Sequence, residues 1–184
     1  MRRFDDREKA FDLNEKGIDF YMLEKYAESI SCFDEAIRLD PEFSDAHHNK
    51  GKSLHLLEKY DEAIACYDEA LELDPENKYS LYRKGLTLHE LEIYDEAIAC
   101  FDEAFWLDPE DADIVFYKGD TLHELEKYDE AIACYDEALG LDPENSEAHH
   151  NKGVTLNKLE RYDEAIACFD EAIRLDPEDQ DVSK

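Results

Sequence analysis

Hydrophobic and polar residues alternate along this chain with the period of an α-helix. In the stretch 61–73, Ala63, Ile64, Tyr67, Ala70 and Leu71 fall at i, i+1, i+4, i+7 and i+8, so they share one helical face. No alternation with a period of two, as a half-buried strand would need, competes with this pattern. The pattern therefore predicts an amphipathic helix.

The sequence also indicates where this helix begins and ends. Asp61, followed by a second acid, is the expected N-cap, and Pro75 ends the helix because proline cannot continue one. A weaker apolar stripe over 44–57 predicts a second helix before it. The residues 58–60 are then a tight turn between two antiparallel helices.

This helix-turn-helix pattern recurs every 34 residues. All five prolines and all five cysteines repeat with this step, as do five of the six glycines. The frames are 10–43, 44–77, 78–111, 112–145 and 146–179, preceded by an N-terminal extension, 1–9, and followed by a C-terminal tail, 180–184. We therefore expect one domain of five repeats.

Each first helix contains a glycine at the same position, Gly51 in the second frame. A glycine inside a helix costs about 1 kcal/mol relative to alanine, so a tertiary contact must offset it. We expect close packing of the two helices, with Tyr67 lying between Gly51 on one side and the small residues Ala63 and Ala70 on the other.

These recurring residues resemble the tetratricopeptide repeat (TPR) family across 10–179. The resemblance is carried in each frame by the counterparts of six residues: Gly51, Tyr60, Ala63, Tyr67, Ala70 and Pro75. It implies an all-α fold, a right-handed α-solenoid of ten main helices in five repeats. It further implies that the first helices line a concave groove in which a partner protein binds.

The charge of the chain excludes several partners. Fifty acidic residues against twenty basic ones give a net charge of −30, and such a surface repels phosphate backbones and anionic lipids. We expect neither nucleic acid nor membrane partners. The chain has no apolar run of about 20 residues and no apolar signal segment at its start, so we expect a cytoplasmic protein.

The acidic residues and the expected groove residues are distributed differently. Most acids recur at the same positions of every second helix, as on a solvated outer face, although an extended cation-binding surface would show the same repetition. The groove positions vary from frame to frame, which favours recognition of a partner. The candidate groove residues are Asn49, Lys52, His55, Tyr79, Tyr82, Arg83, His89, Phe116, Tyr117, Asp120 and His123.

No residue pattern predicts a catalytic, cofactor or metal site. One cysteine per repeat is a poor disulfide framework, so we expect free thiols on a half-buried helix face. His55, His89 and His123 share one position, but one histidine per repeat spaces the ligands too widely for a metal, and a hydrogen-bonding groove wall is the better interpretation. His47 and His149 are expected to pack on the core side. We expect no enzyme, no cofactor and no metal.

The leading functional prediction is a protein interaction scaffold that binds a partner peptide or helix in the groove. The partner is expected to present apolar or aromatic anchors and a carboxylate, which Lys52 and Arg83 would meet. The carboxylate clamp of some TPR proteins is matched here only by Asn49 and Arg83 of its five positions. The alternative prediction is a structural repeat module whose copies associate end to end.

Overall fold

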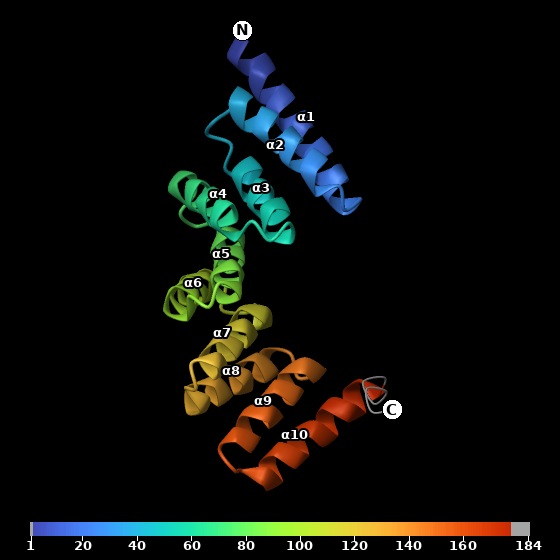
Figure 1. Cartoon of the computed structure of the whole chain (residues 1–184), viewed down its shortest axis with the longest axis vertical. Helices are drawn as coiled ribbons and strands as arrows, with labels where there is room; N and C mark the ends of the chain where they lie inside the picture. The colour runs from blue at the N-terminus through green and yellow to red at the C-terminus, as the bar shows by residue number, and fades with distance from the viewer. Residues whose placement is uncertain (1, 178–184) are drawn as a thin grey trace. The chain divides into compact units, whose positions relative to one another are not determined.

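The structure, a computed structural model, describes residues 2–177 as helices joined by short turns (Figure 1). Within this range there are ten helices and no strand. They are α1 (Arg2–Met22), α2 (Tyr26–Leu39), α3 (Ser44–Leu56), α4 (Tyr60–Leu73), α5 (Lys78–Glu90), α6 (Tyr94–Leu107), α7 (Ala112–Glu124), α8 (Tyr128–Leu141), α9 (Ser146–Lys158) and α10 (Tyr162–Leu175). The all-α prediction is confirmed, as are the two helices of each frame.

The helices contact their neighbours in the order of the chain. The pairs α1 with α2, α3 with α4, α7 with α8, and α9 with α10 pack together, and each second helix also contacts the next first helix, as α2 contacts α3. Contact limited to neighbouring repeats is the packing of an α-solenoid. The chain divides into two compact units, Met1–Ile93 and Tyr94–Lys184, so α5 and α6 belong to different units. Unit 1 contains α1 to α5 and unit 2 contains α6 to α10.

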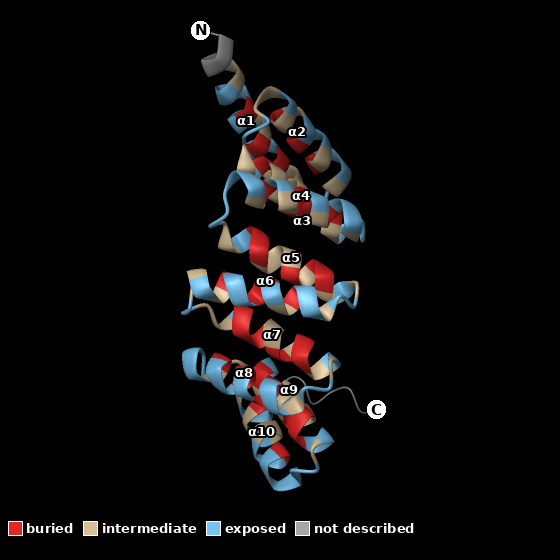
Figure 2. Ribbon diagram, turned by 90° about the vertical axis from the view of Figure 1, so that its left-hand side faces the viewer, coloured by how far each residue is buried: buried red, intermediate tan, exposed pale blue. Residues whose placement is uncertain are grey.

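In the repeats that lie within one unit, the core lies where the second helix packs on the first (Figure 2). Ala63, Tyr67 and Ala70 of α4 are fully buried. A Cβ atom placed on Gly51 of α3 would lie 2.6 Å from Cε1 of the Tyr67 ring, closer than any van der Waals contact. The expected close approach of the tyrosine to the glycine is therefore confirmed.

The turn between the two helices differs from the sequence prediction. Tyr60 is the first residue of α4 rather than part of the turn, and Lys59 is the N-cap, with no side-chain cap. Asp61, the predicted N-cap, lies within the first helical turn. The reason is the tight C-terminus of α3, where the Lys59 amide donates to the Leu54 carbonyl (3.0 Å) and Glu58 takes a left-handed φ of 57°. This reversal leads directly into α4.

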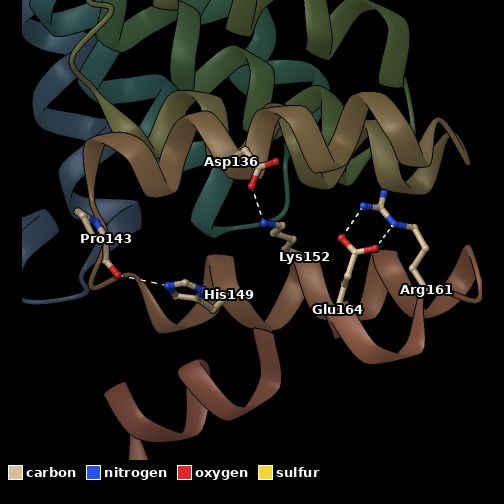
Figure 3. Close-up of polar contacts among 6 residues, drawn as sticks. All are labelled: Asp136, Pro143, His149, Lys152, Arg161 and Glu164. Atoms are coloured by element: carbon tan, nitrogen blue, oxygen red, sulfur yellow. Dashed lines mark hydrogen bonds and ion pairs between the residues drawn. The ribbon is translucent and has the colours of Figure 1, made fainter. Parts of the chain in front are cut away.

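Ion pairs join the second helix of one repeat to the first helix of the next. A lysine of α3, α5, α7 and α9 donates to an aspartate of the preceding second helix at 2.5 to 2.7 Å, and Figure 3 shows the pair in unit 2 that links α9 to α8. The four pairs are Lys50 with Asp34, Lys84 with Asp68, Lys118 with Asp102, and Lys152 with Asp136. Each neutralises one acid of the second helices, but most of the acidic residues stay exposed.

We expect added salt to stabilise the protein. A net charge of −30 on a repeating face makes like charges repel, and this repulsion is screened when the Debye length falls to about 8 Å at 0.15 M ionic strength. The midpoint of thermal unfolding, followed by circular dichroism, should rise by a few degrees between about 0.01 M and 0.15 M sodium chloride. A midpoint that stays constant or falls would show that the ion pairs outweigh the repulsion.

Candidate protein-binding face

Seven of the candidate residues lie in unit 1, on the first helices α3 and α5. Their spacing of three residues on α3, and of three, four and seven residues on α5, places them on one face, which we call the first-helix face. It consists of Asn49, Lys52, His55, Tyr79, Tyr82, Arg83 and His89. The other four candidates lie on α7 in unit 2 and are described separately below.

Hydrogen bonds between consecutive first helices hold this face together. Asn49 Nδ2 of α3 donates to Asn14 Oδ1 of α1 (3.2 Å), and His55 Nδ1 of α3 is 2.9 Å from Thr87 Oγ1 of α5. His48, next to Asn49 on α3, hydrogen-bonds in the same way to Ser80 Oγ (2.9 Å). The amide and imidazole groups therefore position the helices as well as lining the face.

The two cations of the first-helix face, Lys52 and Arg83, differ from Lys50 and Lys84 on the same helices. Lys52 Nζ lies 4.6 Å from the centre of the Tyr21 ring, and Arg83 Cζ lies 5.8 Å from that of Tyr82, which are cation–π contacts. Within residues 2–177 neither forms an ion pair, whereas Lys50 and Lys84 on the same helices both do. The face therefore carries two cations that form no ion pair within the described part of the chain.

This positive charge changes the pKa of the neighbouring groups. Burial, together with the charges of Lys52 and Arg83, lowers the pKa of His48 to about 4. Burial and then Arg83 lower the pKa of His55, and the same two causes lower the pKa of Lys52. Both histidines are thus neutral at pH 7, and the cations lie close enough to repel each other.

Aromatic side chains complete the first-helix face. Tyr79 at the start of α5 is 61% exposed and has Lys78 Nζ 5.0 Å from its ring centre. Tyr82, one turn further, is half-buried. A large exposed tyrosine beside a half-buried one offers contact area with a polar tip, as binding surfaces often do.

The four candidates of unit 2 make more internal contacts. Phe116 is 2% exposed and packs against Tyr117 and Tyr135, with ring centres 5.1 and 6.1 Å apart, so it belongs to the core of its repeat and is no exposed anchor. Its position follows from the apolar run Ile114 to Phe116, all of which is buried. Half-buried Tyr117 remains beside it.

Asp120 and His123 are also engaged within unit 2. Asp120 Oδ1 accepts hydrogen bonds from Tyr135 Oη (2.7 Å) and from Asn151 Nδ2 (2.9 Å). His123 Nδ1 is 2.7 Å from Thr155 Oγ1, which matches the contact of His55 with Thr87 in unit 1. In both units, therefore, the histidine at this shared position, His55 or His123, forms a hydrogen bond with a threonine of the next first helix.

The remaining histidines and the cysteines contribute to packing. His47 Nε2 donates to the Pro41 carbonyl (3.2 Å), and His149 Nε2 donates to the Pro143 carbonyl (3.3 Å; Figure 3), so each fastens the loop before its own helix. All five cysteines are free; four are buried and Cys168 is half-buried. Burial raises the pKa of the Cys134 thiol to about 11, which leaves it unreactive at neutral pH.

The sequence alone did not single out the hydroxyl of Tyr67. Its ring packs on Gly51 as expected, but its oxygen is buried and forms no hydrogen bond of regular geometry within residues 2–177, although the Thr87 hydroxyl lies beside it. A signal existed, because phenylalanine occupies the same position in three of the five repeats, at 33, 101 and 169. A tyrosine there adds only a hydroxyl.

The described residues, 2–177, contain neither a cluster of metal ligands nor a membrane-spanning helix. No group of three or more histidine, cysteine, aspartate or glutamate side chains is placed to hold a metal ion. No helix in this range is both long and apolar enough to cross a membrane.

Comparisons with known proteins agree with the fold. The chain resembles the crystal structure of YrrB, described as a TPR protein with an unusual peptide-binding site, at 26% identity and a TM-score of 0.78, over 93% of this chain and 88% of that one. It also resembles MamA 41-end from Desulfovibrio magneticus RS-1, at 22% identity and a TM-score of 0.86, over 94% of this chain and 97% of that one. No curated protein sequence matches significantly.

Models of one family cover most of the chain. Tetratricopeptide repeat models match residues 10–43, 44–77, 82–141 and 118–180. The first two matches coincide with the first two frames of the 34-residue repeat. Together with ten helices in consecutive helix-turn-helix pairs, they show that the chain belongs to the tetratricopeptide repeat family.

Proposed function

We propose that this repeat scaffold binds an extended or helical segment of a partner protein on its first-helix face. The observation that carries the proposal is the contrast between the two sides of unit 1. The second helix α4 is acidic, with Asp61, Glu62 and Glu69 all exposed. Among the described residues, 2–177, the first helices instead present Lys52 and Arg83 without an ion pair, beside the exposed ring of Tyr79.

The chemistry of this face indicates the partner. In a chain of net charge −30, a local positive face attracts acidic segments, and the acidic remainder of the surface repels them elsewhere. The tyrosines supply rigid apolar contact area for a hydrophobic or aromatic side chain. A partner segment that combines an apolar anchor with a carboxylate fits both features. The likeness to YrrB, whose structure is described as containing a peptide-binding site, supports a peptide as the ligand.

Peptide selection followed by calorimetry tests this function. A peptide library is selected on the full chain, and the best peptide is titrated against variants by isothermal titration calorimetry. Replacing an anchoring tyrosine, as in Tyr79→Ala, should weaken binding by about 1 to 2 kcal/mol, because aromatic anchors carry much of the energy of an interface. The matched control is Glu69→Ala on α4, which is exposed and should change binding little.

The outcome also separates the two candidate functions. Equal losses from Tyr79→Ala and Glu69→Ala, or no loss from either, would contradict binding on the first-helix face. The alternative, self-association through an end of the array, has one observation in its favour within residues 2–177. Ile166 of α10 is 57% exposed, whereas its counterpart Ile132 in α8 is 7% exposed because α9 covers it. Sedimentation at increasing protein concentration measures that association directly.

A further inference from the structure

One position in the last turn of the second helix differs from repeat to repeat. The residue three places before it is a glutamate in every repeat. Because residues three apart are neighbours on a helix surface, this glutamate has a different neighbour in different repeats. The residues at the variable position are, in chain order, Arg38, Glu72, Trp106, Gly140 and Arg174.

In the first and last repeats an arginine at this position binds the glutamate. Arg38 of α2 donates from Nε (2.7 Å) and from a terminal nitrogen to the two carboxylate oxygens of Glu35. Arg174 of α10 binds both oxygens of Glu171 in the same way, at 2.9 and 2.6 Å. These hydrogen bonds lower the pKa of both glutamates. A glutamate here is therefore placed to accept the planar fork of a guanidinium group.

The third repeat has the glutamate without the arginine. Glu103 of α6 is exposed and forms no ion pair with another of the described residues, 2–177, while Asp102 beside it is paired with Lys118 at 2.5 Å. Trp106, the only tryptophan of the chain, stands where the arginine would be. Helical side chains lean toward the N-terminus of their helix, so the indole lies over the turn that carries Glu103.

Packing does not explain this tryptophan. Trp106 is 80% exposed, the largest exposed fraction among the large apolar side chains that the structure describes. Its neighbour Phe105, by contrast, packs against the core cluster that contains Val115 and Phe116. An indole left in water gains little of the free energy of burial. Its face does attract cations, and a guanidinium group can also stack on it.

We propose that Trp106 and Glu103 form a binding site for an arginine side chain in a basic segment of a partner protein. The guanidinium group of the partner forms with Glu103 the two hydrogen bonds that Arg38 forms with Glu35, and its plane stacks on the indole. The site is formed by a second helix, whereas the first-helix face is formed by α3 and α5. It is therefore an interaction beyond the proposed function and does not depend on it.

The charge of the chain favours a basic segment at this site. Asp95 and Glu96, two turns before Asp102 and Glu103 on the same face of α6, are both exposed. In a chain of net charge −30 they attract further cations on either side of the bound arginine. A lysine gains the same attraction, but its ammonium group cannot bind both carboxylate oxygens with one planar fork. The site should therefore prefer arginine to lysine.

The test compares two peptides of equal charge on the full chain. Acetyl-triarginine amide and acetyl-trilysine amide, each carrying the same dye, are titrated by fluorescence anisotropy at about 0.15 M salt, where long-range attraction is screened. Triarginine should bind about two- to fivefold more tightly, as expected of an exposed cation–π contact. The unlabelled peptide should also change the emission of Trp106, which is the only tryptophan and therefore reports on this site alone.

Two variants and a matched control locate the binding. Trp106→Arg gives Glu103 an internal arginine, as in the first and last repeats, so it should fold normally and lose the preference for triarginine. Glu103→Gln keeps the tryptophan and should weaken triarginine binding about two- to fivefold, because an exposed ion pair is lost. The control is Glu137→Gln on α8, where Gly140 replaces the tryptophan. It removes the same charge and should leave the affinity unchanged.

Several outcomes would overturn the arginine site. Absence of triarginine binding, equal affinity of the wild type for both peptides, or an unchanged preference in Trp106→Arg would each do so. Equal losses from Glu103→Gln and Glu137→Gln would show that net charge alone attracts the peptides. The response of a selected peptide to Tyr79→Ala is measured separately, so the proposed function stands if the arginine site fails.

Discussion

Replacing Gly51 by alanine should destabilise the protein, although alanine is the better helix former. The new Cβ atom would lie 2.6 Å from Cε1 and 2.9 Å from Cδ1 of the Tyr67 ring, which is fully buried and cannot move aside. Overpacking of this kind costs about 1 to 3 kcal/mol, while alanine gains about 1 kcal/mol in helix propensity. Because the ring is fully buried, we expect a cost near the upper end of the range, which exceeds that gain. Gly119→Ala should behave in the same way in unit 2, where the Tyr135 ring lies 2.8 Å away.

The sixth glycine provides a matched control. A Cβ on Gly140, in the last turn of α8, has no atom within 4 Å, so Gly140→Ala should stabilise the protein by up to about 1 kcal/mol. Urea unfolding followed by circular dichroism measures all three variants. The expected result is opposite signs for Gly51→Ala and Gly140→Ala. Equal stabilisation by both would show that the helices can separate to admit a methyl group.

The fold could be predicted from the sequence because one period controls every element. The 34-residue step of proline, glycine and cysteine fixed the number of repeats, and Tyr67 with Gly51 identified which faces meet. These predictions succeeded because they concern residues whose size or backbone restrictions leave one solution. Pro75 ends α4 at Leu73, as expected of a residue that cannot continue a helix.

The arrangement of the candidate site was harder to predict. Helical spacing places Phe116 at the same position as His48, but it cannot show that an apolar run turns the phenylalanine into the core. Nor does spacing show which polar groups lack a partner. Around the buried Tyr67 hydroxyl, Lys52 and Arg83 stand where unit 2 has Asp120 and Asn151, and these two residues come from two different repeats. A sequence pattern describes one face of one helix, whereas the hydrogen bonding of a buried group depends on side chains from three helices.

The turn inside each repeat was also mispredicted, because its central residue gives no sequence signal. The residues with positive φ in the described chain are all glutamates, with φ between 57° and 60°, at 24, 58, 92, 126 and 160. Glycine or asparagine normally marks a left-handed helix end. The backbone bonds are nevertheless those of a regular C-terminal cap, since the Glu58 amide donates to the His55 carbonyl (2.8 Å) and the Lys59 amide to that of Leu54 (3.0 Å).

Replacing all five of these glutamates by glycine should therefore stabilise the protein. A residue with a Cβ atom in the left-handed region costs about 1 to 2 kcal/mol, part of which glycine recovers after its own larger loss of backbone entropy on folding. A net gain of about 0.5 to 1 kcal/mol per turn, added over five well-separated sites, amounts to roughly 2.5 to 5 kcal/mol. Urea unfolding at 0.15 M salt measures the sum, and Glu58→Gly alone measures one increment.

The control separates backbone strain from charge. Changing the same five glutamates to glutamine removes the same five negative charges but keeps the Cβ atom, so at 0.15 M salt it should give a much smaller gain. If the glutamine and glycine variants are stabilised equally, relief of repulsion in a chain of net charge −30 is the cause and the left-handed turns are unstrained. If the glycine variant is less stable than the wild type, the entropy of the unfolded chain outweighs the strain. The expected order of stability is glycine, then glutamine, then wild type, because the turn geometry recurs in every repeat while each charge is exposed and screened.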